Sequence, residues 1–364
     1  MSPRLETTVG ALRLARWLGP WTSATSQPPR IRRREVVTAG ARGPLRVWIY
    51  EPTRPTGRVF VVPGLHFLGP ADARMDRFCR ALAASGIQVA APFLPSYLAL
   101  RAHPDVVEDV EAAFDAVLRE PGPGKQIGVF SISFGSLPAI RLAAARAEEL
   151  GGLVVFGGYA SWQETLRFAL EGDAEGRVHD PLSRPVAFLQ VLEHLPGVPA
   201  DPAPLAEAFM RFVRATWNRP PMKEPARYRS VARSMVAELP PSVRELFLLG
   251  TGAVEGSEAV FEEALARAGE ARFAHLDPLP SCRVIATPTL VVHGKDDDVI
   301  PWEQAQTLAA TIPGASLRLT GLYGHSAKEG STASSIRALG GELSALSAIV
   351  KGIAAVGRQP LVPA

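Results

Sequence analysis

The chain of 364 residues has little cysteine, no long apolar run and no large excess of charge of one sign. Its two cysteines, Cys79 and Cys282, form no C-x-x-C motif and exclude a disulfide framework, so we expect two buried thiols. No apolar stretch reaches the roughly 18 residues of a transmembrane helix. The net charge is +3, from 39 basic and 36 acidic residues, which is too small to create an overall positive potential that would attract nucleic acid. Disulfide-stabilised, membrane-spanning and nucleic-acid-binding classes are therefore disfavoured.

Motifs for metals and cofactors are missing as well. The sequence contains no H-E-x-x-H and no dinucleotide-binding fingerprint, and the glycines at residues 122–125 lack the spacing of a phosphate loop. We therefore expect no metal and no cofactor. The first residues do not combine an apolar run with a small-residue cleavage site, so no secretory signal is predicted. Together with the scarcity of cysteine, this favours a cytoplasmic protein.

Residues 1–34 are interpreted as an N-terminal arm. Residues 3–21 can form a short basic amphipathic helix, and an arginine-rich run follows at residues 30–34. One interpretation is a helix packed on the body of the protein. The alternative is a peripheral contact with a membrane surface.

Strands and helices alternate through much of the remaining chain. Residues 45–50 alternate apolar and polar side chains, which predicts a half-buried antiparallel edge strand. Continuous apolar runs at 58–62, 87–91 and 153–156 predict buried strands, and helical patterns lie between them. This rhythm is typical of right-handed crossovers and a mostly parallel sheet flanked by helices.

The join between residues 126–135 and the following helical pattern is the most informative local feature. A strand-type apolar run ends at Ser133, which has Ser131 two positions before it and Gly135 two positions after it. Small residues at these positions allow the tight strand-to-helix turn that lifts a nucleophilic hydroxyl out of a sheet. The pattern is S-x-S-x-G, with Ser131 in place of the usual glycine and serving as a small spacer.

Two later motifs complete a catalytic set. The stretch at residues 287–301 is a buried strand that ends in a glycine turn and three consecutive aspartates, and the stretch at 317–325 is another strand that runs into the glycine-flanked His325. The chain order is Ser133, Asp297, His325, as expected when a serine triad is built on the strand ends of an open parallel sheet.

These motifs resemble those of the α/β-hydrolase family over residues 45–160 and 285–355. The H-G-x-x-D-x-x-x-P form places the acid of the family on Asp297, between His293 and Pro301. The resemblance implies an α/β-hydrolase core, residues 35–157 and 278–364. It also implies a helical cap, residues 158–277, inserted before the strand that carries the acid. The alternative for this insertion is a rigid decoration with no gating role.

The roles of these residues follow from the chemistry of a serine nucleophile. His325 would accept the proton of Ser133, and Asp297 would fix the imidazole tautomer. Asp296 and Asp298 flank Asp297, so its assignment as the acid rests on the register of the motif, and the other interpretation of these two neighbours is a solvated turn. His293 is expected to close a turn by hydrogen bonding rather than act as the base.

An oxyanion hole requires two backbone donors near the nucleophile. The N–H of Phe134, directly after Ser133, is the first candidate. The resemblance places the second in the loop after residues 58–62, where this chain has Pro63-Gly64-Leu65-His66 in place of the more common His-Gly. Leu65 is the candidate donor because it follows the glycine. His66 either lines the pocket or is satisfied by local backbone.

The sequence therefore predicts a cofactor-independent serine hydrolase that cleaves small carboxylic esters through an acyl-enzyme. A peptidase or thioesterase of the same fold is an alternative. A catalytically silent protein that uses this fold for binding is another, because fold alone does not decide function.

Overall fold

The computed structural model describes residues 3–18, 28, 31–172, 179–321 and 347–356 of the chain. The sheet has eight strands in the order β1-β2-β4-β3-β5-β6-β7-β8. The strands are β1 (Arg32–Gly40), β2 (Gly43–Glu51), β3 (Gly57–Val62), β4 (Ile87–Pro92), β5 (Ile127–Ile132), β6 (Leu150–Phe156), β7 (Thr289–Gly294) and β8 (Ser316–Thr320). Strands β3 to β8 are parallel, whereas β2 pairs antiparallel with both β1 and β4. The predicted mostly parallel sheet is confirmed.

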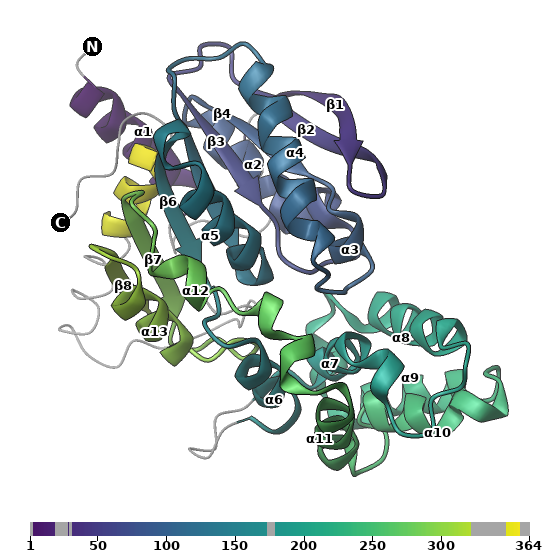
Figure 1. Cartoon of the computed structure of the whole chain (residues 1–364). Coiled ribbons are helices and arrows are strands. Elements are labelled where there is room, and N and C mark those ends of the chain that lie inside the picture. Colours follow the sequence, from purple (N-terminus) through teal and green to yellow (C-terminus); the bar gives the residue numbers. More distant parts are fainter. Residues whose placement is uncertain (1–2, 19–27, 29–30, 173–178, 322–346, 357–364) are drawn as a thin grey trace, which may run out of the picture.

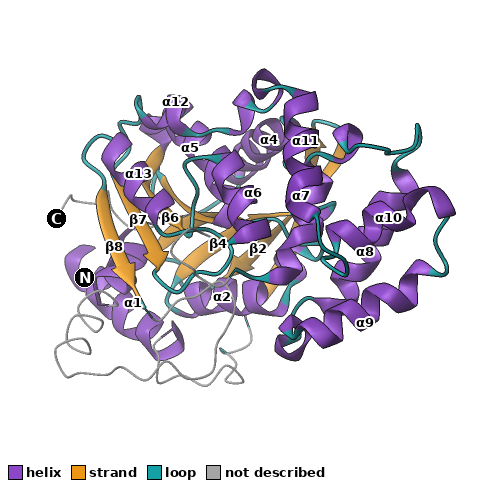
Figure 2. Ribbon diagram, turned by 90° about the horizontal axis from the view of Figure 1, so that it is seen from below, coloured by secondary structure: helices purple, strands orange, loops and turns teal. Residues whose placement is uncertain are grey.

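Helices cover both faces of this sheet, as Figures 1 and 2 show. On one face lie α4 (Asp105–Arg119), α5 (Ser136–Ala145), α12 (Leu279–Cys282) and α13 (Glu303–Thr311). On the other face lie α1 (Pro3–Leu18), α2 (Ala73–Ala84) and the helical residues 347–356. The short α3 (Pro95–Leu98) follows β4.

Burial on both faces explains the continuous apolar strands. In β3, Val59 and Val61 pack into the cluster that contains α2, whereas Phe60 and Val62 pack into the cluster beneath α4 and α5. Successive side chains of a strand point to opposite faces, so a strand covered on both sides is largely apolar. The buried Arg58 near the start of β3 is the exception, and its guanidinium donates to the Val117 carbonyl. All six residues of β3 are buried.

The antiparallel edge of the sheet differs from the prediction. The strand expected at the edge, residues 45–50, is the second strand, because β1 pairs with β2 along its whole length and forms the edge itself. β1 begins at Arg32, inside the segment predicted as the arm. Its arginines form ion pairs, Arg33 with Asp76 at 2.8 Å and Arg34 with Glu51 at 2.6 Å. A strand stabilised by ion pairs lacks the apolar alternation by which strands are identified.

The N-terminal helix packs on the body of the protein. Ala11 and Leu14 of α1 are buried in the cluster that also contains residues of α2 and of the helix 347–356. Of the two interpretations of residues 3–21, the packed helix is therefore the one that the structure supports. Both cysteines are buried, as expected.

Between β6 and β7, the described residues form helices, 3-10 turns and irregular links, and no strand. The helices are α6 (Trp162–Glu171), α7 (Arg184–Gln190), α8 (Ala203–Thr216), α9 (Pro225–Val236), α10 (Pro241–Gly250) and α11 (Ser257–Ala268). In Figure 1 they gather at one end of the sheet. We refer to residues 158–277 as the insertion.

Aromatic side chains of the insertion pack against one another, within the same hydrophobic cluster that lies beneath α4 and α5. The Phe209 ring lies 6.1 Å from that of Phe188 and 5.9 Å from that of Phe247, and all three side chains are fully buried. Gly250 is required at the end of α10, because a Cβ there would lie 2.5 Å from the Phe209 ring. This packing joins α7, α8 and α10 into one unit.

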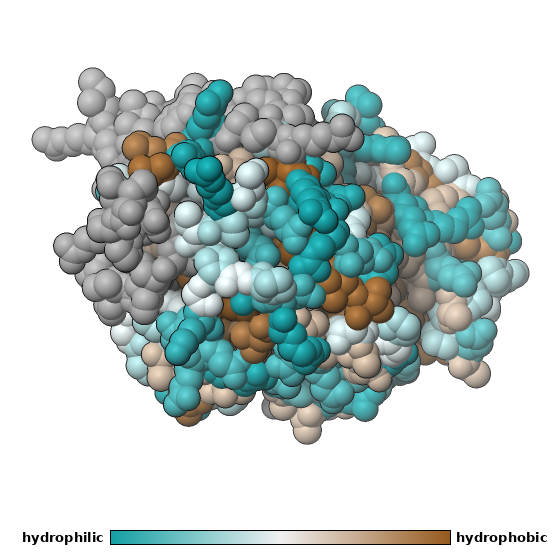
Figure 3. All heavy atoms as spheres, turned by 90° about the horizontal axis from the view of Figure 1, so that it is seen from above, coloured by the Kyte–Doolittle hydropathy of each residue, from teal (hydrophilic) through white to brown (hydrophobic). Residues whose placement is uncertain are grey.

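The surface shows no large apolar area on the face seen in Figure 3, where brown atoms form small separate groups among hydrophilic ones. The large exposed apolar side chains of the described residues are scattered over different elements: Leu12, Val37, Leu68, Val254 and Val284. No helix among the described residues is both long enough and apolar enough to cross a membrane.

Candidate active site

Ser133 lies at the sharp turn between β5 and α5. Its φ of +54° falls in the left-handed region, which a non-glycine residue occupies only at the cost of strain. The residues Ser133–Gly135 form one short 3-10 turn that leads directly into α5. Such strain, of order 1–3 kcal/mol, is concentrated at functional sites in proteins. The strained turn expected of a nucleophile elbow is therefore present at the predicted residue.

Close packing explains the small residues around Ser133. A Cβ at Gly135 would lie 2.5 Å from the carbonyl oxygen of Val62, so only glycine fits there. Ser131 is fully buried, and its hydroxyl donates to the Val154 carbonyl at 3.3 Å. The hydroxyl of Ser131 thus belongs to the sheet interior, whereas the Ser133 side chain retains 8% exposure.

The loop after β3, residues 63–72, lies directly against the nucleophile. We call it the β3 loop. A Cβ built on Gly64 would lie 3.0 Å from the Cβ of Ser133 and 3.5 Å from its hydroxyl oxygen. Leu65 follows Gly64, and within the described part of the chain its backbone N–H makes no hydrogen bond. Phe134 is at the start of a helical segment, where N–H groups have no intrahelical acceptor. Both predicted oxyanion donors therefore belong to segments next to Ser133.

The loop after β7, residues 295–302, carries the aspartates. We call it the β7 loop. The Oδ1 atom of Asp297 accepts hydrogen bonds from the backbone N–H groups of Val299 and Ile300, both at 2.9 Å. Its Oδ2 atom lies 3.3 Å from Nε2 of His293. These contacts fix the orientation of the Asp297 carboxylate, whose side chain is 2% exposed.

His293 behaves as the sequence predicts. Its imidazole is fully buried, and its Nε2 lies 3.0 Å from the carbonyl oxygen of Ile300. A proton on this nitrogen satisfies the carbonyl and closes the turn around Asp297. Both described contacts of Nε2, with Ile300 and with Asp297, lie within this turn.

The expectation of a solvated turn is wrong for Asp298. Its side chain is 5% exposed, and one oxygen lies 2.7 Å from the ammonium of Lys223, a residue of the insertion. The same ammonium lies 2.8 Å from a carboxylate oxygen of Asp180. The neighbouring Asp296 is half-buried. The error arose because the partner of Asp298 is 75 residues away in the sequence.

His325, the predicted base, lies outside the described residues. Among the described residues, β5 carries Ser133 and β7 carries Asp297 at their carboxyl ends, with β6 between them in the parallel sheet. Strand β8, which the sequence predicts to lead toward His325, pairs parallel with β7 and ends at Thr320. The three chain segments thus approach the same edge of the sheet.

A second cluster joins the β3 loop to the insertion. The Nδ1 atom of His66 accepts the backbone N–H of Leu68 at 3.1 Å, which places the imidazole proton on Nε2, 3.4 Å from Asp72. His66 is therefore satisfied by local backbone, one of the two expectations. From the insertion, Asn218 donates to Asp72 at 3.1 Å, and the Trp217 ring lies 5.6 Å from that of His66.

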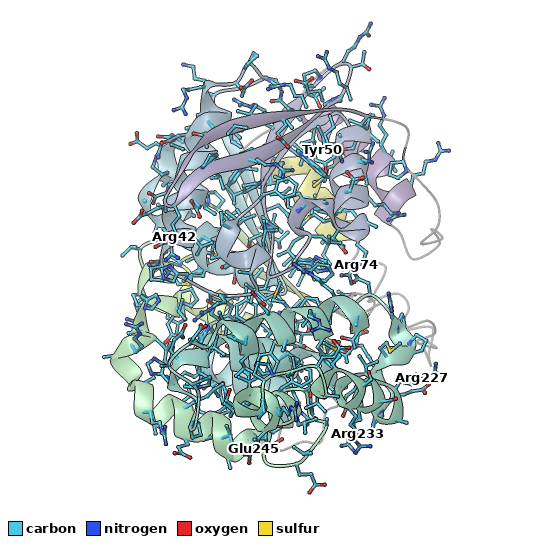
Figure 4. The ribbon with its side chains drawn as sticks, turned by 90° about the vertical axis from the view of Figure 1, so that its right-hand side faces the viewer. Arg42, Tyr50, Arg74, Arg227, Arg233 and Glu245 are labelled. Carbon is cyan, nitrogen blue, oxygen red and sulfur yellow. The ribbon has the colours of Figure 1, made fainter. Side chains whose placement is uncertain are left out.

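The electrostatics of this cluster follow from burial and from one arginine. Burial lowers the pKa of His66, so the imidazole is neutral at pH 7. Burial acts to raise the pKa of Asp72, but Arg74 and His66 hold it below its ordinary value. Figure 4 shows Arg74 at the level where core and insertion meet, whereas Arg227, Arg233 and Glu245 lie farther out on the insertion.

Sequence reasoning missed the residues that connect the insertion to these loops, Asp72, Asp180, Trp217, Asn218 and Lys223. No local motif marks them, since each is defined by a partner far along the chain. The one available signal was Asn218, because asparagine tolerates the left-handed backbone that it adopts here, with a φ of +62°. No three His, Cys, Asp or Glu side chains gather within the described ranges in a way that could hold a metal ion.

Comparison with known proteins identifies the fold. No protein-family model and no curated protein matches the sequence. Among solved structures, a 2,6-dihydroxy-pseudo-oxynicotine hydrolase has a TM-score of 0.51 and 15% identity, covering 92% of this chain and 71% of that one. An esterase from Pyrococcus furiosus has a TM-score of 0.47 and 14% identity, covering 91% of this chain and 97% of its own. An acylaminoacyl peptidase from Pyrococcus horikoshii has a TM-score of 0.46 and 12% identity, covering 89% of this chain and 40% of its own.

At these identities the likeness shows the fold alone. The eight-stranded, mostly parallel sheet and the similarity to the hydrolase structure establish that the chain has the α/β-hydrolase fold. The fold implied by the sequence resemblance is thereby confirmed. The activity has to be argued from the site itself.

Proposed function

We propose that the protein is a serine hydrolase that cleaves carboxylic esters through an acyl-enzyme. The observation that carries the proposal is the left-handed Ser133 at the β5–α5 join, packed against Gly64 of the β3 loop. A strained serine held beside a loop with an unused backbone donor is the arrangement that acyl transfer requires.

The proposed reaction uses Ser133, His325 and Asp297 in sequence. The Ser133 oxygen attacks the ester carbonyl while His325 accepts its proton, and Asp297 stabilises the resulting imidazolium. The N–H groups of Phe134 and Leu65 bind the oxyanion of the tetrahedral intermediate. His325 then protonates the leaving alcohol. Water, deprotonated by His325, attacks the acyl-enzyme and releases the acid and Ser133.

The insertion is proposed to act as a cap that defines the acyl pocket. Its contacts with both the β3 loop and the β7 loop support this, because these two loops flank Ser133 in the proposed mechanism. In this account the sheet provides the chemistry and the insertion selects the acyl chain. The aromatic side chains buried in the insertion, such as Phe209 and Phe212, are structural core.

The activity is tested with p-nitrophenyl esters of graded acyl length, beside a matched thioester and a matched anilide. We expect wild-type protein to hydrolyse at least one ester, with a higher kcat/KM than for the anilide. Ser133→Ala protein, purified in parallel, controls for contaminating esterases. Unchanged hydrolysis by Ser133→Ala protein would show that Ser133 is not the nucleophile.

The cap proposal is tested by excising the insertion at its base. The Trp162 and Phe273 rings stack at 4.5 Å, so replacing residues 163–272 with a short linker preserves this closing contact. The excised protein should hydrolyse short acyl esters and lose the chain-length preference of the full chain. An unchanged preference would show that the insertion is a rigid decoration.

A further inference from the structure

One short segment of the insertion contacts both loops beside the proposed nucleophile. This segment, residues 217–223, links α8 to α9 and is called the brace here. Its first two residues contact the β3 loop, and its last residue contacts the β7 loop. The brace therefore connects, outside the sheet, the loop that carries Leu65 and the loop that carries Asp297.

The contact with the β3 loop is made by two specific side chains. Trp217 donates its indole N–H to the Leu182 carbonyl at 3.0 Å, which fixes the ring beside His66. The next residue, Asn218, has a left-handed φ and directs its amide to Asp72. Asparagine tolerates this backbone conformation, and the hydrogen bond to Asp72 fixes the position of its amide.

The contact with the β7 loop is a partly buried ion pair. The Lys223 side chain is 26% exposed and the Asp298 side chain 5% exposed. Burial opposes the charge of Lys223, but Asp180 and Asp298 together raise its pKa above the ordinary value. The backbone N–H of Asp180 also donates to the carbonyl of Asp298 at 2.7 Å. The insertion thus binds both the side chain and the backbone of the residue next to Asp297.

We infer that Lys223 is a positioning residue for the proposed reaction, acting through Asp298 on the carboxylate of Asp297. This inference rests on the proposed function. It assigns to the brace a role in holding the acid in place, separate from any role of the insertion in selecting substrate.

The electrostatics predict what happens when the cation is lost. Without the ammonium, the repulsion between the carboxylates of Asp180 and Asp298 is no longer offset by Lys223. Asp298 then moves away from Asp180, and the adjacent Asp297 moves with the loop. Displacement of a catalytic group by about 1 Å can cost on the order of a hundredfold in rate.

The test compares Lys223→Met with a matched control, Arg101→Met. Arg101 also forms an ion pair with the insertion, with Glu193 at 2.8 Å, but it touches neither the β7 loop nor the β3 loop. Steady-state kinetics are measured with one short acyl ester. Lys223→Met should lower kcat about tenfold to a hundredfold with KM within about twofold, whereas Arg101→Met should leave both unchanged. The conservative Lys223→Arg should restore most of kcat.

The labelling rate with a small fluorophosphonate separates the two proposals. If wild-type protein is not labelled, the proposed function fails. If wild-type protein is labelled and Lys223→Met is labelled at the same rate, the positioning role fails while the proposed function stands. A Lys223→Met effect on KM alone would likewise overturn the positioning role.

A double variant tests whether Lys223 acts on Asp297 through Asp298. Combining Lys223→Met with Asp298→Asn should cost no more in kcat than the worse single variant, since both break the same link. Thermal unfolding is followed for every variant to show that each is folded at the assay temperature. Independent, multiplicative losses in kcat would contradict action through Asp298.

Discussion

The sheet and the insertion hold their functional side chains in different ways. In the sheet, Ser133 and Asp297 follow directly from β5 and β7, whose positions are set by backbone hydrogen bonds with neighbouring strands. In the insertion, Asn218 lies in an irregular link and Lys223 ends a short 3-10 helix, Pro220–Lys223; both contact the loops beside the sheet through their side chains. One region fixes its residues by backbone geometry, and the other by a few polar contacts.

This difference is visible in the backbone. The described residues include three non-glycine residues with left-handed φ, namely Leu100, Ser133 and Asn218. Ser133 is the proposed nucleophile. The other two lie where core and insertion meet, since the Leu100 carbonyl accepts a hydrogen bond from Gln190 of α7 and Asn218 donates to Asp72. Left-handed backbone at non-glycine residues is thus found at the proposed nucleophile and where the core and the insertion meet.

The largest expected effect concerns the sheet. Ser133→Ala should lower kcat by about three to six orders of magnitude, because it removes the proposed nucleophile. Ser131→Ala is the matched control, since the Ser131 hydroxyl donates to Val154 inside the sheet. Circular dichroism should show an unchanged fold for both. A large loss in Ser131→Ala together with activity in Ser133→Ala would reverse the assignment.

The second-largest effect on kcat is expected for substitution of the acid, Asp297. Asp297→Asn should lower kcat by several orders of magnitude, because the imidazole of His325 loses the carboxylate that fixes its tautomer. Asp296→Asn should have a mild effect, and Asp298→Asn an intermediate one through its link to Lys223. Equal losses at Asp296 and Asp297, measured by steady-state kinetics, would show that the aspartates act as a cluster.

A packing change in the insertion should leave the chemistry intact. Gly250→Ala places a Cβ against the Phe209 ring and should destabilise the insertion by about 1–3 kcal/mol. The labelling rate of Ser133 by a small probe should not change at temperatures where the protein stays folded. A parallel loss of stability and labelling would show that packing in the insertion also controls the position of Ser133.

The smallest expected effect is on the pH dependence of stability, through His66, which contacts the insertion. Its pKa is lower in the folded protein than in the unfolded chain, because burial disfavours the charged imidazole. The contribution of neutral His66 to stability is present above the unfolded pKa, near 6.5, and is lost as pH falls through the folded value. Wild-type protein should therefore lose more unfolding free energy than His66→Gln between about pH 7 and pH 5. Chemical denaturation of both proteins at the two pH values measures this difference.

The sequence could predict those features that are encoded locally. The elbow at Ser133, the turn closed by His293 and the parallel strands all depend on neighbouring residues and on a regular period, so each leaves a readable pattern. The edge strand β1 did not, because its arginines are stabilised by ion pairs with Asp76, Glu51 and Glu120. The links at Asn218 and Lys223 did not either, because their partners lie 146 and 75 residues away along the chain.

Fluorophosphonate labelling followed by peptide mapping tests the central claim most directly. The proposed mechanism predicts one phosphonyl group on the wild-type chain, carried by Ser133, and none on Ser133→Ala. An unlabelled wild-type protein, or a label carried by Ser131 or by a serine of the insertion, would contradict the claim that the β5–α5 turn holds the nucleophile.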